Sequence, residues 1–147
     1  MSRVHLWTMV EASPEEVWEV VANPRNLPRW NRHVRTVTGA PENGLARGSR
    51  YTTEIGAMGL RFHVDAEVVE LDPPKYAQVR LHGPVDATVR TWVHRAGSRR
   101  ARLEHEVEYR LKGGPLGEAI ARVFKLLGGS QILRRGLRAQ KQQVEEG

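Results

Sequence analysis

The position of His105 makes it the clearest candidate for acid–base chemistry in this sequence. His105 lies in the alternating run 100–111, on the same side as the apolar residues Leu103 and Val107. An imidazole buried on that side without a hydrogen-bond partner would cost on the order of a few kcal/mol. We therefore expect either a neighbouring hydroxyl or a bound ligand beside His105. An ordinary histidine pKa of about 6.5 suits a general acid or base near neutral pH.

Two tyrosines are the other candidates for contact with a ligand. Tyr109 follows His105 by four residues on the same side, about 13 Å away at about 3.3 Å per residue. That distance is too long for a direct pair, but both side chains could reach one elongated ligand. Tyr51 alternates with Thr53 and Ile55 in a separate run. A tyrosine so placed either lines a cavity or packs with its hydroxyl at the rim, and both interpretations stay open.

Other chemistries lack the residues or spacings that they require. The six histidines are scattered, with no HExxH and no close pair, so we expect no metal site. His63, His82 and His94 could approach one another on one face only if their strands align. The sequence has no cysteine, no GxSxG and no GxGxxG or Walker sequence. We therefore expect no thiol or serine nucleophile, and no nucleotide or other cofactor.

The candidate residues belong to runs in which apolar side chains alternate with a period of two. A first run covers 3–12, and turn signals rich in glycine and proline separate the later ones. These later runs are 34–39, 48–55, 60–71, 75–82, 85–95 and 100–111. Such short connections favour an antiparallel meander, because parallel pairs need long crossovers. The pattern makes one face of this sheet apolar, so we expect another element to cover it.

Two short helices are predicted between the first and second runs. Ser13 can cap the first helix, with Pro14 at its first position and Glu16 completing a capping box. The pair at 23–24 repeats this cap-and-proline signal, and its proline lacks the amide hydrogen that one long helix would need. The second helix should therefore be separate and end near Trp30.

The C-terminal segment is the predicted cover of the apolar face. Apolar residues recur near helical spacing from Leu116 to Val144, which predicts one helix over about 115–144. At 1.5 Å per residue this helix would be about 45 Å long, enough to cross the sheet. Gly128 and Gly129 interrupt its middle. They indicate either a bend or close packing against a strand, or else room for a ligand beneath the helix.

Length and composition limit the class of protein. The 147 residues, 39% hydrophobic and 27% charged, suit one domain covering 1–147. The sequence contains no apolar run of about 18 residues and no evident signal peptide, so we expect a cytoplasmic protein. The net charge is +6, and cations gather in the C-terminal segment. We do not expect nucleic-acid binding as the main function, whereas peripheral membrane contact stays open and the oligomeric state is undetermined.

Five segments resemble the START-like (SRPBCC) superfamily, and within it the polyketide cyclase/dehydrase family. They are EASPEEVWEVVANPRNLPRWNRHVRTV at 11–37, GSRYTTEIG at 48–56, EVVELDPPKYAQVR at 67–80, LKGGPLGEAIAR at 111–122 and RRGLRAQKQQVEE at 134–146. The resemblance implies an α+β helix-grip fold, a curved seven-stranded antiparallel sheet around a long C-terminal helix, with two short helices after the first strand. The family shares a cavity but no common catalytic motif, so the resemblance carries a fold more directly than an activity.

The resemblance also implies a hydrophobic small-molecule ligand, such as a polyketide, a lipid or a related metabolite, held between the sheet and the C-terminal helix. If the protein is an enzyme, we expect cyclisation, dehydration or isomerisation without a cofactor. The first alternative is a non-enzymatic carrier of a lipid or metabolite, in one version at a membrane surface. The second is an interaction protein whose cavity is filled with side chains.

The residues expected to line this cavity lie on the apolar face or at its edge. They are Trp30, Tyr51, Phe62, Val64, Val79, Trp92, His105, Tyr109, Val123 and Leu127, with His105, Tyr109 and Tyr51 as the catalytic candidates. Strict alternation would place Trp92 beside Thr88 and Arg90 on the opposite face, and a bulge would reverse this. The facing of Trp7 is ambiguous for the same reason.

Overall fold

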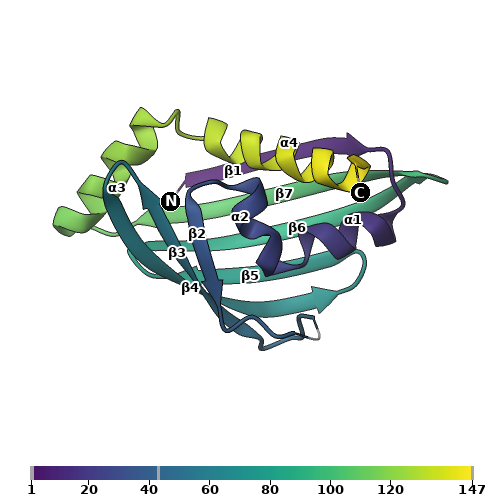
Figure 1. The fold of residues 1–147 in the computed structure, drawn as a ribbon, viewed down its shortest axis with the longest axis horizontal. Helices are drawn as coiled ribbons and strands as arrows, with labels where there is room; N and C mark the ends of the chain where they lie inside the picture. Colours follow the sequence, from purple (N-terminus) through teal and green to yellow (C-terminus); the bar gives the residue numbers. More distant parts are fainter. Residues whose placement is uncertain (1, 43, 147) are drawn as a thin grey trace.

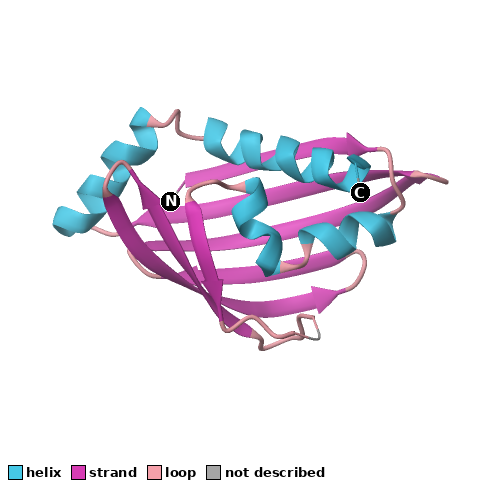
Figure 2. Cartoon of the chain, viewed as in Figure 1, coloured by secondary structure: helices cyan, strands magenta, loops and turns pink. Residues whose placement is uncertain are grey.

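The computed structural model describes residues 2–42 and 44–146. Its strands are β1 (Ser2–Val10), β2 (Val34–Thr38), β3 (Arg50–Ala57), β4 (Leu60–Asp72), β5 (Tyr76–His82), β6 (Val85–Gly97) and β7 (Arg100–Leu111). Its helices are α1 (Pro14–Val21), the 3-10 turn η1 (Pro24–Asn26), α2 (Leu27–Trp30), α3 (Gly114–Leu126) and α4 (Gln131–Glu146). Figures 1 and 2 show α1, α2 and α4 across one face of a curved sheet. This is the α+β helix-grip arrangement that the sequence predicts.

All seven strands form one antiparallel sheet in the order β1-β7-β6-β5-β4-β3-β2. Each strand from β2 to β7 pairs with its neighbour in the chain, and β1 joins the far edge by pairing with β7. The predicted runs match these strands closely, because period-two alternation and turn residues specify strands without reference to the rest of the fold. The predicted meander is therefore confirmed.

The two short helices begin where the cap signals place them. The Ser13 hydroxyl accepts a hydrogen bond from the Glu16 amide at 3.2 Å, and the Glu16 carboxylate accepts from the Ser13 amide at 3.3 Å. These two bonds are the capping box of α1. At the start of η1, the Asn23 side chain accepts a hydrogen bond from the Arg25 amide at 3.0 Å. The chain then passes through η1 into α2, so the helical segment ends at Trp30 as predicted.

The C-terminal segment forms two helices, so the single helix predicted over 115–144 is wrong. Gly128 and Gly129 adopt left-handed conformations, with φ of 102° and 59°, which end α3 before α4 starts. The Arg135 guanidinium donates to the Leu127 carbonyl at 2.9 Å and so satisfies a carbonyl at the break. The two glycines therefore mark a bend, which turns α3 away from the axis of α4 (Figure 1). No helix in the described part of the chain is both long and apolar enough to cross a membrane.

The hydrophobic core lies where α4 and α1 cover β1, β7 and β6. Its buried residues are Leu6, Val10, Ala12, Val17, Val93, Ala101, Leu103, Leu137 and Val144. Because α4 packs directly onto this half of the sheet, side chains fill the space beneath it. The other half of the inner face, on β3 to β5, is covered by α1, η1 and α2.

Candidate ligand-binding site

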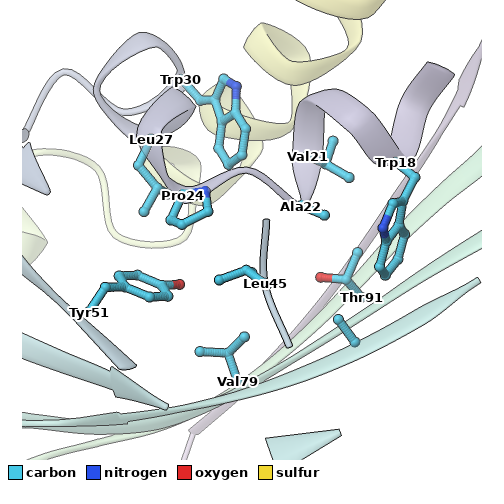
Figure 3. A pocket seen from close by; sticks show the side chains of 11 residues that line it. Trp18, Val21, Ala22, Pro24, Leu27, Trp30, Leu45, Tyr51, Val79 and Thr91 are labelled. Atoms are coloured by element: carbon cyan, nitrogen blue, oxygen red, sulfur yellow. The ribbon is translucent and has the colours of Figure 1, made fainter. Parts of the chain in front are cut away.

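A pocket of about 70 Å³ lies between the short N-terminal helices and the inner face of the sheet (Figure 3). Its walls are mostly apolar, and tryptophans stand on the helical side. The lining residues are Trp18, Val21, Ala22, Pro24, Leu27, Trp30, Leu45, Tyr51, Ala77, Val79 and Thr91. At about 30 Å³ per water molecule, a volume of this size holds about two waters or one compact organic group.

Three of the residues expected at a cavity line this pocket, namely Trp30, Tyr51 and Val79. The pocket lies beneath α1 and α2, whereas the sequence placed the cavity beneath a helix over 115–144. The difference follows from the break in that helix and from the packing of α4 onto β1. Alternation identified the residues of the inner face correctly, but it could not show which helix would leave space above them.

Five other expected residues lie on elements outside this pocket. Phe62 lies opposite Ile55, and Val64 is buried opposite Thr53, both between β3 and β4. The Tyr109 ring packs edge-on against Phe124 of α3, with ring centroids 5.8 Å apart. Val123 and Leu127 are half-buried residues at the end of α3. The structure thus separates these side chains from the pocket that contains Tyr51.

Trp92 lies on the outer face of the sheet, so it does not line the pocket. It pairs with Glu104 on one side and with Tyr76 on the other, and its ring lies 5.5 Å from the Tyr76 ring. Strict alternation therefore holds along β6, without a bulge at this position. Trp7 is also on the outer face, 53% exposed, with the Arg102 guanidinium 4.6 Å from its ring centroid.

Tyr51 contributes a hydroxyl that points into the pocket (Figure 3). Within the described residues this hydroxyl makes no hydrogen bond to the protein. Burial raises the pKa of Tyr51 to about 12, because a buried phenolate would lose its hydration. The phenol is therefore neutral at physiological pH. It can donate one hydrogen bond to a carbonyl or other acceptor of a bound molecule.

Trp30 connects the helical wall of the pocket to α4. Its indole N–H donates to the Gln143 side-chain oxygen at 2.7 Å. The bond satisfies the polar atom of a tryptophan whose ring lines an apolar space. Sequence reasoning missed Gln143, because this residue belongs to a helix that is far from Trp30 in the chain.

His105 lies beside the pocket and has two hydrogen-bond partners. Its Nδ1 is 2.8 Å from the Thr91 hydroxyl, and its Nε2 is 2.8 Å from the Gln140 side-chain oxygen. Burial lowers the pKa of His105, although the hydrogen bond to Gln140 partly opposes the shift. We expected either a neighbouring hydroxyl or a bound ligand beside His105, and the structure has the hydroxyl of Thr91 there. The partners were missed because Thr91 comes into place through the β6–β7 register and Gln140 through the packing of α4.

Four of the five remaining histidines lie near carboxylates on the outer face, and His33 is the exception among the described residues. His63 lies 3.6 Å from Glu54, and His94 lies 3.1 Å from Glu104, which also contacts His5. His63 and His94 are thus on different strands with separate partners. Among residues 2–42 and 44–146, no group of three or more histidines and carboxylates has the arrangement of a metal site.

Comparisons with known proteins agree with this architecture. The sequence profile of the family described as "Polyketide cyclase / dehydrase and lipid transport" matches residues 1–145. Zhui aromatase/cyclase from Streptomyces sp. R1128 superposes with a TM-score of 0.77 at 15% identity, over 99% of this chain and 94% of that one. A START superfamily protein from Mycobacterium smegmatis gives a TM-score of 0.74 at 15% identity, over 98% and 97% of the two chains.

A third similar structure is the di-domain ARO/CYC BexL from the BE-7585A biosynthetic pathway. It gives a TM-score of 0.69 at 20% identity over 99% of this chain, which spans 47% of that longer protein. No curated protein matches the chain in sequence. At these identities the three structures establish the fold alone.

The sheet and its helical cover form the helix-grip fold that the START superfamily structure shares. Because the family profile covers nearly the whole sequence, the chain belongs to the polyketide cyclase/dehydrase and lipid transport family.

Proposed function

We propose that this protein binds a compact hydrophobic molecule with a polar oxygen in the pocket beneath α1 and α2. The observation that carries the proposal is an apolar pocket into which one neutral, unpartnered hydroxyl points, that of Tyr51. Apolar walls supply most of the binding free energy by removing the ligand surface from water, and a few polar groups fix its orientation. A polyketide-derived ring or a lipid-like metabolite has this combination.

The volume of the pocket restricts the ligand. Pockets that enclose drug-sized ligands measure about 300–1,000 Å³, and this one measures about 70 Å³. One small ring is therefore the largest group that this pocket encloses as it stands, since a cavity of about 150 Å³ is known to hold benzene. A two-ring molecule would need the lining side chains to move apart. A longer polyketide or acyl chain would require Leu45, in the segment between β2 and β3, to move out of the wall.

Tryptophan fluorescence can test this proposal with 2-tetralone, a bicyclic ketone, as the probe. Trp7 and Trp92 are first changed to Phe, which leaves Trp18 and Trp30, both in the pocket wall. We expect saturable quenching, and we expect Ala22→Leu to weaken it because the added methyl groups occupy the pocket. Thr88→Leu on the outer face is the matched control. Equal quenching of the Ala22→Leu and control variants, or none in the parent, would contradict binding at this pocket.

A specific surface favours a second candidate function, that of a carrier which docks on an anionic membrane. Helix α3 exposes Leu126 and Leu116, 66% and 44% accessible. Arg122 and Lys125 of the same helix are exposed and form no ion pair in the part of the chain that the structure describes. Exposed leucines beside unpaired cations are typical of helices that lie in a lipid headgroup layer.

Co-sedimentation with lipid vesicles tests this second candidate. We expect binding to phosphatidylserine-containing vesicles, no binding to phosphatidylcholine alone, and release at high salt, where the Debye length falls to about 3 Å. The double change Arg122→Gln with Lys125→Gln should abolish binding. Arg61→Gln with Arg80→Gln removes the same charge from the exposed outer face of the sheet and should leave vesicle binding intact. Equal loss in both pairs, or binding to RNA instead of vesicles, would contradict a membrane-docking surface.

A further inference from the structure

Three polar side chains from three elements form a continuous hydrogen-bonded line that begins at the pocket wall. Thr91 of β6 lines the pocket, and its partner in the strand register is His105 of β7. The Thr91 hydroxyl is 2.8 Å from Nδ1 of His105, and Nε2 of His105 is 2.8 Å from Oε1 of Gln140 on α4. Gln140 is only 7% exposed, so the line ends inside the protein.

The partners determine where the protons lie. The Gln140 oxygen is an acceptor, so it requires the proton of His105 on Nε2. The other ring nitrogen, Nδ1, then has a free lone pair and accepts the hydrogen bond that the Thr91 hydroxyl donates. Burial keeps the imidazole neutral by lowering its pKa. A neutral imidazole held in one tautomer, with an alcohol on its basic nitrogen, is the arrangement of a general base.

We propose that Thr91, His105 and Gln140 form a proton relay that enolises a carbonyl compound held in the pocket. This proposal rests on the proposed function, because the relay needs a bound ligand. In Figure 3 the Tyr51 and Thr91 hydroxyls enter the pocket from opposite sides, with Leu45 between them. A ketone that contacts both would displace the Leu45 side chain, with its carbonyl oxygen toward Tyr51 and its α-carbon toward Thr91.

The proposed step balances without a cofactor or co-reactant. The α-carbon gives its proton to the Thr91 oxygen while the Thr91 proton moves to Nδ1 of His105. The electron pair of the broken C–H bond forms the enolate, whose oxygen accepts the hydrogen bond of Tyr51. His105 becomes an imidazolium. While the enolate persists, the Thr91 hydroxyl at the pocket wall exchanges its proton with solvent. The reverse transfer then gives a solvent-derived proton to the α-carbon and restores the neutral ring. Gln140 touches no ligand atom and acts as a positioning residue, since it holds the tautomer.

A purely structural network would contain the same hydrogen bonds, because buried polar groups need partners. The two roles differ in one consequence, the transfer of a proton to and from a bound ketone. Exchange of the α-protons of 2-tetralone in D₂O, followed by ¹H NMR, measures that transfer directly. Tryptophan quenching by the same ketone measures binding separately.

We expect the protein to accelerate exchange at least about a hundredfold over buffer, the lower end of the range of general acid–base catalysis. Thr91→Val and His105→Gln should each remove most of the acceleration and change the dissociation constant less than about threefold. Thr88→Val on the outer face of the same strand is the matched control and should retain the rate. Binding without acceleration, or acceleration that survives Thr91→Val, would overturn the relay alone. Absence of saturable binding would overturn the relay together with the proposed function.

Gln140→Glu should change the pH dependence of the exchange rate, which a change in packing alone would leave unaltered. The carboxylate would stabilise the imidazolium, so the acid limb of the pH–rate profile should shift to higher pH. The elements packed against His105 present Thr91, Leu6 and Gln140, all uncharged, and Glu104 is the charged neighbour on its own strand. An unchanged profile in a variant that still binds 2-tetralone would refute the positioning role.

Discussion

At the scale of single residues, burial determines which side chains are available for chemistry. Tyr51 and His105 are both uncharged near pH 7, because burial raises the pKa of the phenol and lowers the pKa of the imidazole. Tyr51 keeps a free hydroxyl, whereas Thr91 and Gln140 hold both ring nitrogens of His105. The Tyr51 hydroxyl is therefore free to bond to a ligand, whereas the His105 ring is held by protein groups.

Tyr51→Phe should weaken binding of 2-tetralone by about 3- to 10-fold, the effect of losing one hydrogen bond to the ketone. Binding of tetralin, which has the same rings without the carbonyl, should not change. Fluorescence titrations of both ligands, with tyrosine and with phenylalanine at position 51, provide the comparison. A parallel loss for both ligands would show that the substitution acts through packing instead.

Acid should destabilise the protein through His105 before the carboxylates titrate. The pKa of His105 is lowered in the folded state, so between that value and 6.5 the unfolded chain binds more protons. Its contribution to stability is complete above pH 6.5 and is lost as the pH falls through the folded pKa. The loss amounts to about 1.4 kcal/mol per unit of pKa lowering. Urea unfolding between pH 7.5 and 5 should show a steeper decline for the native protein than for His105→Gln.

At the scale of elements, the break between α3 and α4 decides where the pocket lies. Helix α4 alone covers β1 and completes the core, and α3 lies apart from it beyond the glycines (Figure 1). The pocket is left beneath α1 and α2, where Trp30 bonds to Gln143 of α4. The half of the sheet under α4 is thus packed with side chains, and the half under α1 and α2 contains the pocket.

Gly128→Ala should lower the free energy of unfolding by about 1–2 kcal/mol, because an L side chain is strained at a φ of 102°. An added Cβ would also lie 3.1 Å from the Arg135 guanidinium. Gly113→Ala, where a Cβ meets nothing within 4 Å, is the matched control. If Gly128→Ala instead stabilised the protein, as alanine does within a continuous helix, the bend would not be the native arrangement.

At the scale of the whole molecule, carboxylates on the outer face join strands that are distant in the chain. Burial opposes ionisation of Glu104, but hydrogen bonds with His5 of β1 and His94 of β6 outweigh it and hold its pKa below the usual value. For Glu108, the hydrogen bond from Arg90 has the same effect. These contacts link β1, at the start of the chain, to β6 and β7 in its second half.

The protein should lose further stability as the pH falls below about 4.5. The folded-state pKa values of Glu104 and Glu108 lie below that of a free carboxyl, so the unfolded chain takes up protons first. Their contribution is present above pH 4.5 and disappears as the pH passes through the lowered values. The slope of stability against pH between 4.5 and 3 should be smaller for Glu108→Gln than for the native chain. Arg80→Gln, an exposed change on β5 at a residue with no ion pair in the described part of the chain, should leave that slope unaltered.

The sequence alone determined the strands, the caps at Ser13 and Asn23, the inward sides of β4, β5 and β7 and, through the resemblance, the family. Those features depend on neighbours in the chain, on a period of two and on local hydrogen bonds, which a sequence displays directly. The tertiary structure decided the place of the pocket, the outward facing of Trp92 and the partners of His105. Each of these depends on residues brought together from distant segments: Thr91 through strand register, and Gln140 through the packing of α4 after the bend at Gly128.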